Sequence, residues 1–228
     1  MIGAALAGLA AAGLAAHGTW HRNSWIWGPA LSRLPGSDNA VSITFDDGPN
    51  PHATPLILDA LAASGVQATF FVLGRHADRW PALVKRMSDE GHQLGNHGYF
   101  HRKLHRRSPL YVRDDLTRGA DAIERACGVR PGVFRAPHGF RNPWVTPIAR
   151  SLGQRTIGWS LGVWDSARPG ADEIVRRALS GMRAGSILLL HDGDGYDADG
   201  DRLQTAAALP RIIEGLRERG FRFATLPD

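Results

Sequence analysis

The stretch TFDDGPNPHATP, residues 44–55, decides the fold, because it joins the end of an apolar strand to the start of a helix through a tight turn. A strand-like run at residues 41–45 precedes two adjacent acids, Asp46 and Asp47, while Thr54 and Pro55 are typical of a helix N-cap and a first helical position. Neighbouring side chains of an extended chain point to opposite sides, so the two acids have either separate partners or roles in the turn. The dipeptide alone is compatible with both interpretations.

Strand-like and helix-like segments alternate through the rest of the chain. Expected strands cover residues 41–45, 67–73, 92–95, 132–134, 155–160, 186–190 and 221–225. Expected helices cover residues 54–64, 77–90, 109–126, 142–153, 171–182 and 202–219. This alternation predicts a parallel sheet with helical crossovers, and functional side chains gather at the carboxyl ends of the strands in such sheets.

The composition is that of a globular protein, with 228 residues, 43% hydrophobic and 21% charged. Its one cysteine, Cys127, excludes an intrachain disulfide and a cysteine-rich metal site. The net charge is +5, and the densest basic run is HRKLHRR at residues 101–107. No aromatic residue is interleaved in this run and no recognisable nucleic-acid motif accompanies it, so we expect a solvated loop and no nucleic-acid partner.

The N-terminal segment differs from the rest of the chain. Residues 1–16 carry no charge and are mostly Ala, Gly and Leu, and the tryptophans Trp20, Trp25 and Trp27 follow them. Sixteen residues fall short of the roughly 20 that a membrane-crossing helix needs, and the basic start of a secretory signal is missing. We predict a weak membrane anchor or a signal-like segment, with membrane association through residues 1–28, and a helix packed on the domain is the alternative.

The same segment bears on domain division and location. Turn-forming residues at 34–39 predict a boundary, which gives an N-terminal apolar segment and linker at residues 1–38 and one domain at residues 39–228. A membrane-associated or extracytoplasmic location is favoured over a cytoplasmic one. No pattern indicates an oligomeric state.

Polar side chains follow five of the expected strands. Each of them alone has an ordinary structural explanation, as a hydrogen-bonded histidine or a surface ion pair. Together, on one edge of a parallel sheet, they favour a functional site. They are Asp46 and Asp47 after the first strand, His97 and His101 after the third, Arg135 after the fourth, Asp165 after the fifth, and His191 and Asp192 after the sixth.

Two of these histidines indicate a metal site. His97 and His101 are four residues apart, a spacing at which both can reach one ion on a helical turn or a tight loop. Asp47 is the natural third ligand, and Asp46 would then face the water as a general base. Opposite side-chain directions thus allow one acid to bind the metal while the other accepts a proton.

The remaining strand-end residues suit proton transfer. We expect His191 to protonate a leaving amine and Asp165 to hold its ring in the required tautomer. Arg135 is expected to pair with Asp46 and keep it ionised. The chemistry indicated by these residues is metal-dependent hydrolysis.

Five segments then match one family in order. TFDDG at 44–48, His97 with His101, RAPHG at 135–139, Trp-Asp at 164–165 and LLLH at 188–191 resemble the five motifs of the polysaccharide deacetylases, the NodB-homology domains or carbohydrate esterase family four. The resemblance covers residues 39–226. It implies a single-domain deformed (β/α)7 barrel of mostly parallel strands with outer helices.

The resemblance also implies an activity and a role for each motif residue. The activity is hydrolysis of N-acetyl groups of GlcNAc-containing poly- or oligosaccharides with one divalent ion, usually Zn2+, whereas similar ligand sets also accept Co2+ or Ni2+. The implied roles are Asp46 as base, Asp47, His97 and His101 as metal ligands, His191 as acid, Arg135 orienting the base, Asp165 tuning His191, the backbone N–H of His138 at the oxyanion, and Leu189 beside the acetyl methyl.

Four positions depart from the family pattern. Gly98 stands where Ser or Thr is usual, so a hydroxyl that would brace the ligand loop is absent, and His138 replaces Tyr. Gly162 and Ser166 replace an Asp and a Trp, and these two departures bear most directly on Asp165.

Other functions are compatible with parts of the sequence. An O-acetyl carbohydrate esterase on the same fold and a non-catalytic carbohydrate-binding protein are the alternatives, and chitin fragments, peptidoglycan and lipid-linked glycans all fit as saccharides. The acidic loop at residues 192–201 resembles a calcium loop but has no glutamate at the twelfth position, so we expect a mobile loop beside the site.

Overall fold

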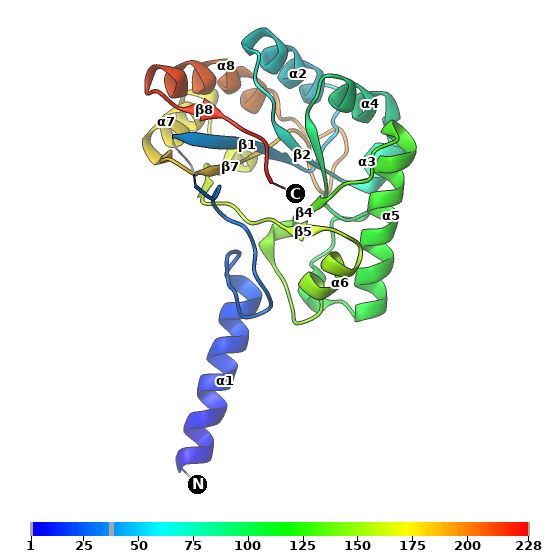
Figure 1. Ribbon diagram of the computed structural model, residues 1–228, viewed down its shortest axis with the longest axis vertical. Helices are drawn as coiled ribbons and strands as arrows, with labels where there is room; N and C mark the ends of the chain where they lie inside the picture. The colour runs from blue at the N-terminus through cyan, green and yellow to red at the C-terminus, as the bar shows by residue number, and fades with distance from the viewer. Residues whose placement is uncertain (1, 37–38, 228) are drawn as a thin grey trace.

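The computed structural model describes residues 2–36 and 39–227. A curled sheet lies at its centre, and helices pack around the outside (Figure 1). The predicted fold class, a single-domain (β/α)7 barrel of the deformed type, is confirmed. Residues 37 and 38 of the predicted domain boundary lie outside the described residues, and the division at residue 38 stays a prediction.

The sheet is parallel and has β1 (Ala40–Asp46) near its middle. The other strands are β2 (Thr69–Val72), β3 (Gln93–Asn96), β4 (Val133–Phe134), β5 (Arg155–Thr156), β6 (Leu161–Gly162) and β7 (Ile187–His191), in the order β5-β4-β3-β2-β1-β7-β6. The short β8 (Arg222–Phe223) pairs with β1 at Ala40 and Val41. The register sets Asp46 beside His191, so the carboxyl ends of β1 and β7 bring two predicted site residues together.

Within the described residues, seven helices enclose this sheet (Figure 1). They are α2 (Ala53–Ser64), α3 (Gly74–Arg79), α4 (Pro81–Asp89), α5 (Pro109–Cys127), α6 (Val145–Ser151), α7 (Ala171–Gly181) and α8 (Leu203–Glu218). Three 3-10 turns, η1 (Leu104–Arg106), η2 (Pro137–Gly139) and η3 (Asp165–Ala167), lie in the loops after strands.

The core fixes the positions of the strand ends. Phe45 and Phe70 stack at 5.0 Å between ring centroids, and apolar faces of α2 and α8 pack on the same cluster through Ile57 and Leu209. Burying one large apolar side chain stabilises a fold by about 1.5–3 kcal/mol, so a cluster of this size holds the sheet in one register. The core therefore sets the positions at which β1, β3, β4 and β7 end.

Two helix predictions were wrong in detail. The expected helix at 77–90 is broken at Trp80, because the following proline, Pro81, disfavours helical backbone in the residue before it. Thr54 lies inside α2 instead of capping it. The carboxamide of Asn50 accepts hydrogen bonds from the backbone N–H groups of His52 and Ala53, so Asn50 satisfies the first turn.

Other boundaries follow the sequence more closely. The hydroxyl of Ser108 accepts from the backbone N–H of Tyr111 at the start of α5, and Gly65 ends α2 in the left-handed conformation. The expected strand at 155–160 ends after Thr156, and β6 was not predicted. Ile157 still donates to the carbonyl of Phe134, and the carbonyl of Gly158 accepts from the buried Arg135.

The N-terminal helix α1 (Ile2–Trp20) projects from the domain (Figure 1). Every side chain from residue 6 to residue 15 is exposed, so this part is not the packed helix of the alternative prediction. No helix among the described residues combines the length and the apolarity that a membrane crossing needs.

Candidate active site

A cleft of about 630 Å³ opens at the carboxyl ends of the strands. Loops after β1, β3, β4, β6 and β7 all contribute to its walls, as expected for a parallel sheet. Asp46, Asp47, His97, His101 and His191 all line it.

Three buried residues form a cluster that could hold a metal ion. Each of Asp47, His97 and His101 offers one ligand atom, and these atoms lie within 4.8 Å of one another. Oδ1 of Asp47 is 3.1 Å from Nε2 of His101 and 3.3 Å from Nε2 of His97. Nδ1 of His97 lies 2.9 Å from the carbonyl oxygen of Arg135, a contact in which Nδ1 donates and which turns Nε2 toward Asp47.

The electrostatics of this cluster fit a divalent cation. Oδ1 of Asp47 is buried and has no well-formed hydrogen bond to any described residue, a costly arrangement that a cation between the three ligands would relieve. Burial raises the pKa of Asp47, but the charges of His101 and His97 outweigh it and hold the pKa well below its ordinary value. Burial lowers the pKa of His101 to about 3, so its ring is neutral, as a metal ligand must be.

A carboxylate braces the loop that carries the two histidines. Asp115 on α5 accepts hydrogen bonds from the backbone N–H groups of Tyr99 (3.2 Å) and Phe100 (3.1 Å). A Cβ at Gly98, where φ is +78°, would lie 2.4 Å from Oδ2 of Asp115. Glycine at position 98 therefore leaves room for Asp115, and Asp115 braces the loop in place of the Ser or Thr hydroxyl that the family pattern has at this position.

Asp46 is oriented by a fully buried arginine. Nη1 of Arg135 donates to Oδ1 of Asp46 at 2.6 Å and to the hydroxyl of Thr44 at 2.8 Å, while Nη2 donates to the carbonyl of Gly158 at 3.0 Å. The guanidinium stacks over the ring of Phe71, 4.0 Å from its centroid. Asp46 and Asp47 thus have separate partners, in line with the first of the two sequence interpretations.

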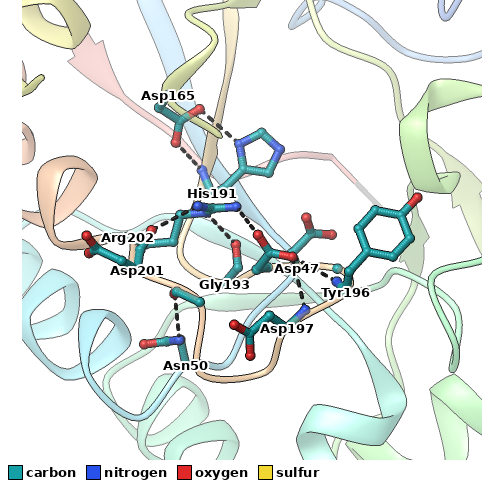
Figure 2. A network of polar contacts seen from close by, with 12 residues as sticks. Asp47, Asn50, Asp165, His191, Gly193, Tyr196, Asp197, Asp201 and Arg202 are labelled. Atoms are coloured by element: carbon teal, nitrogen blue, oxygen red, sulfur yellow. Dashed lines mark hydrogen bonds and ion pairs between the residues drawn. The ribbon is translucent and has the colours of Figure 1, made fainter. Parts of the chain in front are cut away.

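His191 is paired with Asp165 (Figure 2). Nδ1 of His191 lies 2.9 Å from Oδ1 of Asp165, and Oδ2 accepts from the backbone N–H of His191 (2.8 Å) and from the hydroxyl of Thr205 (2.9 Å). Burial alone lowers the pKa of His191, but the charge and hydrogen bond of Asp165 outweigh it and raise the pKa to about 9. The departures at Gly162 and Ser166 leave this pair intact.

The other predicted residues also lie at the cleft. His138 has φ of +60° in η2, and its ring centroid is 4.6 Å from that of His101. Its Nε2 is 3.0 Å from the hydroxyl of Tyr196. Leu189 on β7 is nearly buried and contributes an apolar patch to the wall.

The acidic loop forms a wall of this cleft, and its mobility stays a prediction. Arg202, which is buried, donates to the carbonyls of Gly193 and Asp201, each at 2.8 Å, and to Oδ2 of Asp194 at 2.6 Å (Figure 2). Gly195 packs directly on the ring of His101, where a Cβ would lie 2.0 Å from Nδ1. Asp194 also accepts from the backbone N–H groups of Tyr196 and Asp197, and Asp199 pairs with Arg79.

Asp192 and Thr54 form a buried pair next to the turn that follows Asp46 and Asp47. The hydroxyl of Thr54 donates to Oδ2 of Asp192 at 2.6 Å. Burial and the charge of Asp47 raise the pKa of Asp192 to about 7. Asp192 also lies so close to Gly48 that a Cβ there would be 2.0 Å from it, which explains why the turn after Asp47 needs glycine.

The N-terminal segment contributes a wall that the sequence did not predict. Trp20, His21 and Arg22 line the cleft, and the guanidinium of Arg22 lies 5.2 Å from the ring centroid of Trp159. No motif marks these residues, and the partner of Arg22, Trp159, is 137 positions away in the chain.

Comparison with known proteins agrees with this geometry. The family model for polysaccharide deacetylases matches residues 33–157. The chitooligosaccharide deacetylase of Bradyrhizobium sp. (strain ANU 289) is 40% identical over 198 residues, covering 83% of this chain and 90% of the relative. The peptidoglycan-N-acetylglucosamine deacetylase of Bacillus cereus (strain ATCC 14579) is 37% identical over 200 residues, covering 86% and 90%.

A solved structure shares the fold over nearly the same range. The crystal structure of the Bc1960 peptidoglycan N-acetylglucosamine deacetylase superimposes with a TM-score of 0.79 at 33% identity, covering 87% of this chain and 90% of that one. The chain described here belongs to the polysaccharide deacetylase family.

Proposed function

We propose that this protein is a metal-dependent deacetylase that hydrolyses N-acetyl groups of GlcNAc-containing poly- or oligosaccharides, releasing acetate and leaving a free amine. One observation carries the proposal: a buried cluster of one aspartate and two histidines shares a cleft with Asp46 and His191, each held by its own charged partner. The names of the relatives, which are deacetylases of chitooligosaccharides and of peptidoglycan, support the same reaction class.

Asp47, His97 and His101 are the residues that would hold the ion. A divalent cation bound there, Zn2+ by preference and Co2+ or Ni2+ as alternatives, supplies a Lewis acid that polarises the acetyl carbonyl and lowers the pKa of water. The neutral state of His101 and the ionised state of Asp47 leave both groups ready to coordinate without losing a proton first.

Asp46 acts as the general base. Its Oδ1 is occupied by Arg135, so Oδ2 accepts the proton of the attacking water. Because Arg135 is charged at every working pH, the orientation of the carboxylate does not change during the reaction.

His191 acts as the general acid toward the leaving amine. Asp165 holds Nδ1, so the proton that is transferred comes from Nε2. A pKa of about 9 keeps the ring protonated near neutral pH, which an amide substrate requires because an unprotonated amine is a poor leaving group.

His138 and Leu189 complete the proposal. The backbone N–H of His138 would donate to the oxyanion, a contribution of roughly 10²–10³-fold for one donor. Leu189 would contact the acetyl methyl. Both roles rest on the family motifs and on their positions in the wall of the cleft.

The test is an acetate-release assay on N-acetylated chitin oligomers and peptidoglycan fragments, with O-acetylated xylan oligomers as the ester panel. Activity is expected to disappear with a chelator, to return with Zn2+, and to be absent in Asp46→Asn with its metal content unchanged. Acetate release only from the esters would identify an O-acetyl esterase. Absence of release from every substrate in the metal-loaded protein would identify a non-catalytic binding protein.

A further inference from the structure

The N-terminal helix α1 carries an apolar stretch, residues 6–15, that is exposed throughout. Leu6, Leu9 and Leu14 of α1 are between 58% and 71% exposed, and no charged side chain occurs before residue 17. Neither Gly8 nor Gly13 has any atom within 4 Å of where its Cβ would lie. An exposed apolar surface of this length marks a site of interaction.

The base of this helix is fixed to the domain. The backbone N–H of Arg141 donates to the carbonyl of Thr19, and its buried guanidinium donates to the carbonyls of Ser24 and Gly28. Trp27 packs on Gly18 and donates through Nε1 to the hydroxyl of Thr19 at 3.2 Å. The direction in which α1 projects is therefore set by the fold.

Charge is segregated toward the end of the molecule that carries α1. Residues 1–37, 91–113 and 132–164 together contain eleven of the 27 lysines and arginines and none of the 22 acidic residues. The segments meet at the base of α1: His105 packs edge-on against Trp20 at 6.4 Å, and Asn142 donates to the carbonyls of Leu104 and Arg107.

Five exposed cations in these segments form what we call the basic cluster. None of them has an ion pair within residues 2–36 and 39–227. Elsewhere on the surface, arginines such as Arg86 and Arg130 are paired with carboxylates. The basic cluster consists of Arg22, Arg102, Lys103, Arg106 and Arg107.

We propose that α1 and the basic cluster together bind the surface of a membrane containing anionic lipid. An apolar helix and a group of cations are the two components that stable interfacial binding combines. Trp20 and Trp25, which are 59% and 77% exposed, lie between the two components, where indole rings favour the interface. This inference does not depend on the proposed function.

Two other partners fit the surface less well. A symmetric second copy would bring one basic cluster toward another, where their like charges repel. Nucleic acid would pair with the cations but would leave the apolar helix in water. Lipid accounts for both features at once.

Docking also determines where the cleft opens. Trp20 and Arg22 belong to the docking surface and also line the cleft, so the mouth of the cleft is held beside the lipid headgroups. Saccharides attached to the membrane then reach the site at high local concentration.

The test is cosedimentation of the full-length protein with unilamellar vesicles, either of pure phosphatidylcholine or of phosphatidylcholine and phosphatidylglycerol in equal parts. Each Lys or Arg near an anionic surface contributes about fivefold in affinity, so the triple variant Lys103→Gln, Arg106→Gln and Arg107→Gln is expected to bind the anionic vesicles about 100-fold more weakly. The matched control is Arg176→Gln, Arg211→Gln and Arg219→Gln on α7, α8 and the residue after it, distant from α1 (Figure 1). It makes the same change in net charge and should bind like the unmodified protein.

A second variant tests the helix. Leu6→Gln, Leu9→Gln and Leu14→Gln together should weaken binding at least tenfold on both kinds of vesicle, because each removes buried apolar area. Equal binding of the basic-cluster variant and its control, or no binding of the unmodified protein to anionic vesicles, overturns the proposal. The proposal is also overturned if light scattering shows that the unmodified protein is a dimer, that the dimer persists in the presence of vesicles, and that the leucine variant is a monomer.

Acetate release from a soluble N-acetylated oligosaccharide separates this result from the proposed function. The variants leave the metal cluster untouched, so that activity should persist when vesicle binding is lost. Absence of acetate release in a protein that still binds anionic vesicles would contradict the proposed function and leave the docking surface in place.

Discussion

Two carboxylate–cation pairs stand on neighbouring strands beside the candidate metal cluster, and they differ in the partner that can change its charge. In the pair of Asp46 and Arg135 the cation is permanent, so the interaction fixes the orientation of a carboxylate. In the pair of His191 and Asp165 the cation titrates, so the same kind of contact raises the pKa of a ring. The nature of the cation thus separates a proposed base from a proposed acid within one site.

The largest effect is expected when the pair of Asp46 and Arg135 is altered. Asp46→Asn should lower kcat/KM for acetate release by about 10²–10⁴-fold, because the amide can still accept from Arg135 but cannot take a proton. Metal content, measured by mass spectrometry, and the thermal midpoint should change little. Activity within threefold of the unmodified enzyme would remove Asp46 from the role of base.

The next largest effect comes from breaking the second pair, and it should differ between amide and ester substrates. His191→Asn should lower the rate on an N-acetyl substrate by about 10²–10⁴-fold but on a matched O-acetyl ester by roughly tenfold, because an alcohol leaves with less help from an acid than an amine does. The two rates are compared in one enzyme preparation. Equal losses on both substrates would show that His191 is not the group that protonates the leaving amine.

A change in the loop that carries His97 and His101 should affect metal binding but leave the roles of the two carboxylate–cation pairs unchanged. Gly98→Ala forces a Cβ against Asp115 at a backbone conformation that disfavours alanine, so we expect the affinity for Zn2+ to fall about 10–100-fold. Competition with a fluorescent chelator measures that affinity. At saturating Zn2+ the amide-to-ester ratio should match that of the unmodified enzyme, and a changed ratio would mean that the loop does more than hold the metal.

The smallest expected effect is a shift in pH dependence. The pKa of His191 is raised above its ordinary value, so the ring is protonated and active at lower pH, and activity falls as pH rises through about 9. The contribution of the pair to stability is complete below about pH 6.5 and is lost over the same rise.

Asp165→Asn removes the charge that raises this pKa. The alkaline limb of the kcat profile should move to lower pH, and activity at pH 7.5 should fall about tenfold while the loss at pH 6 is smaller. An alkaline limb that stays near pH 9 in Asp165→Asn would assign it to another group. The unchanged profile of Tyr196→Phe, which alters the cleft without touching this pair, is the control.

The predictable part of the site came from residues that follow strands. Strand-like runs before Asp46, His97, Arg135 and His191 were apparent, and a parallel sheet necessarily brings such ends to one edge. Local turn chemistry was less predictable. Asn50 rather than Thr54 satisfies the N–H groups at the start of α2, because an Asn three residues before the helix can reach two of them while the hydroxyl of Thr54 donates to the buried Asp192.

The sequence alone determined the parallel α/β architecture, the order of the motifs and the identity of the groups that can bind a metal or move a proton, since these depend on local pattern and residue chemistry. Only the tertiary structure decided that Asp115 braces the ligand loop, that Arg202 binds the acidic loop, and that Trp20 and Arg22 form a wall of the cleft. The physical reason is that each of the latter depends on packing between elements, which no short stretch of sequence specifies. The chain encodes such contacts only through the whole core that brings those elements together.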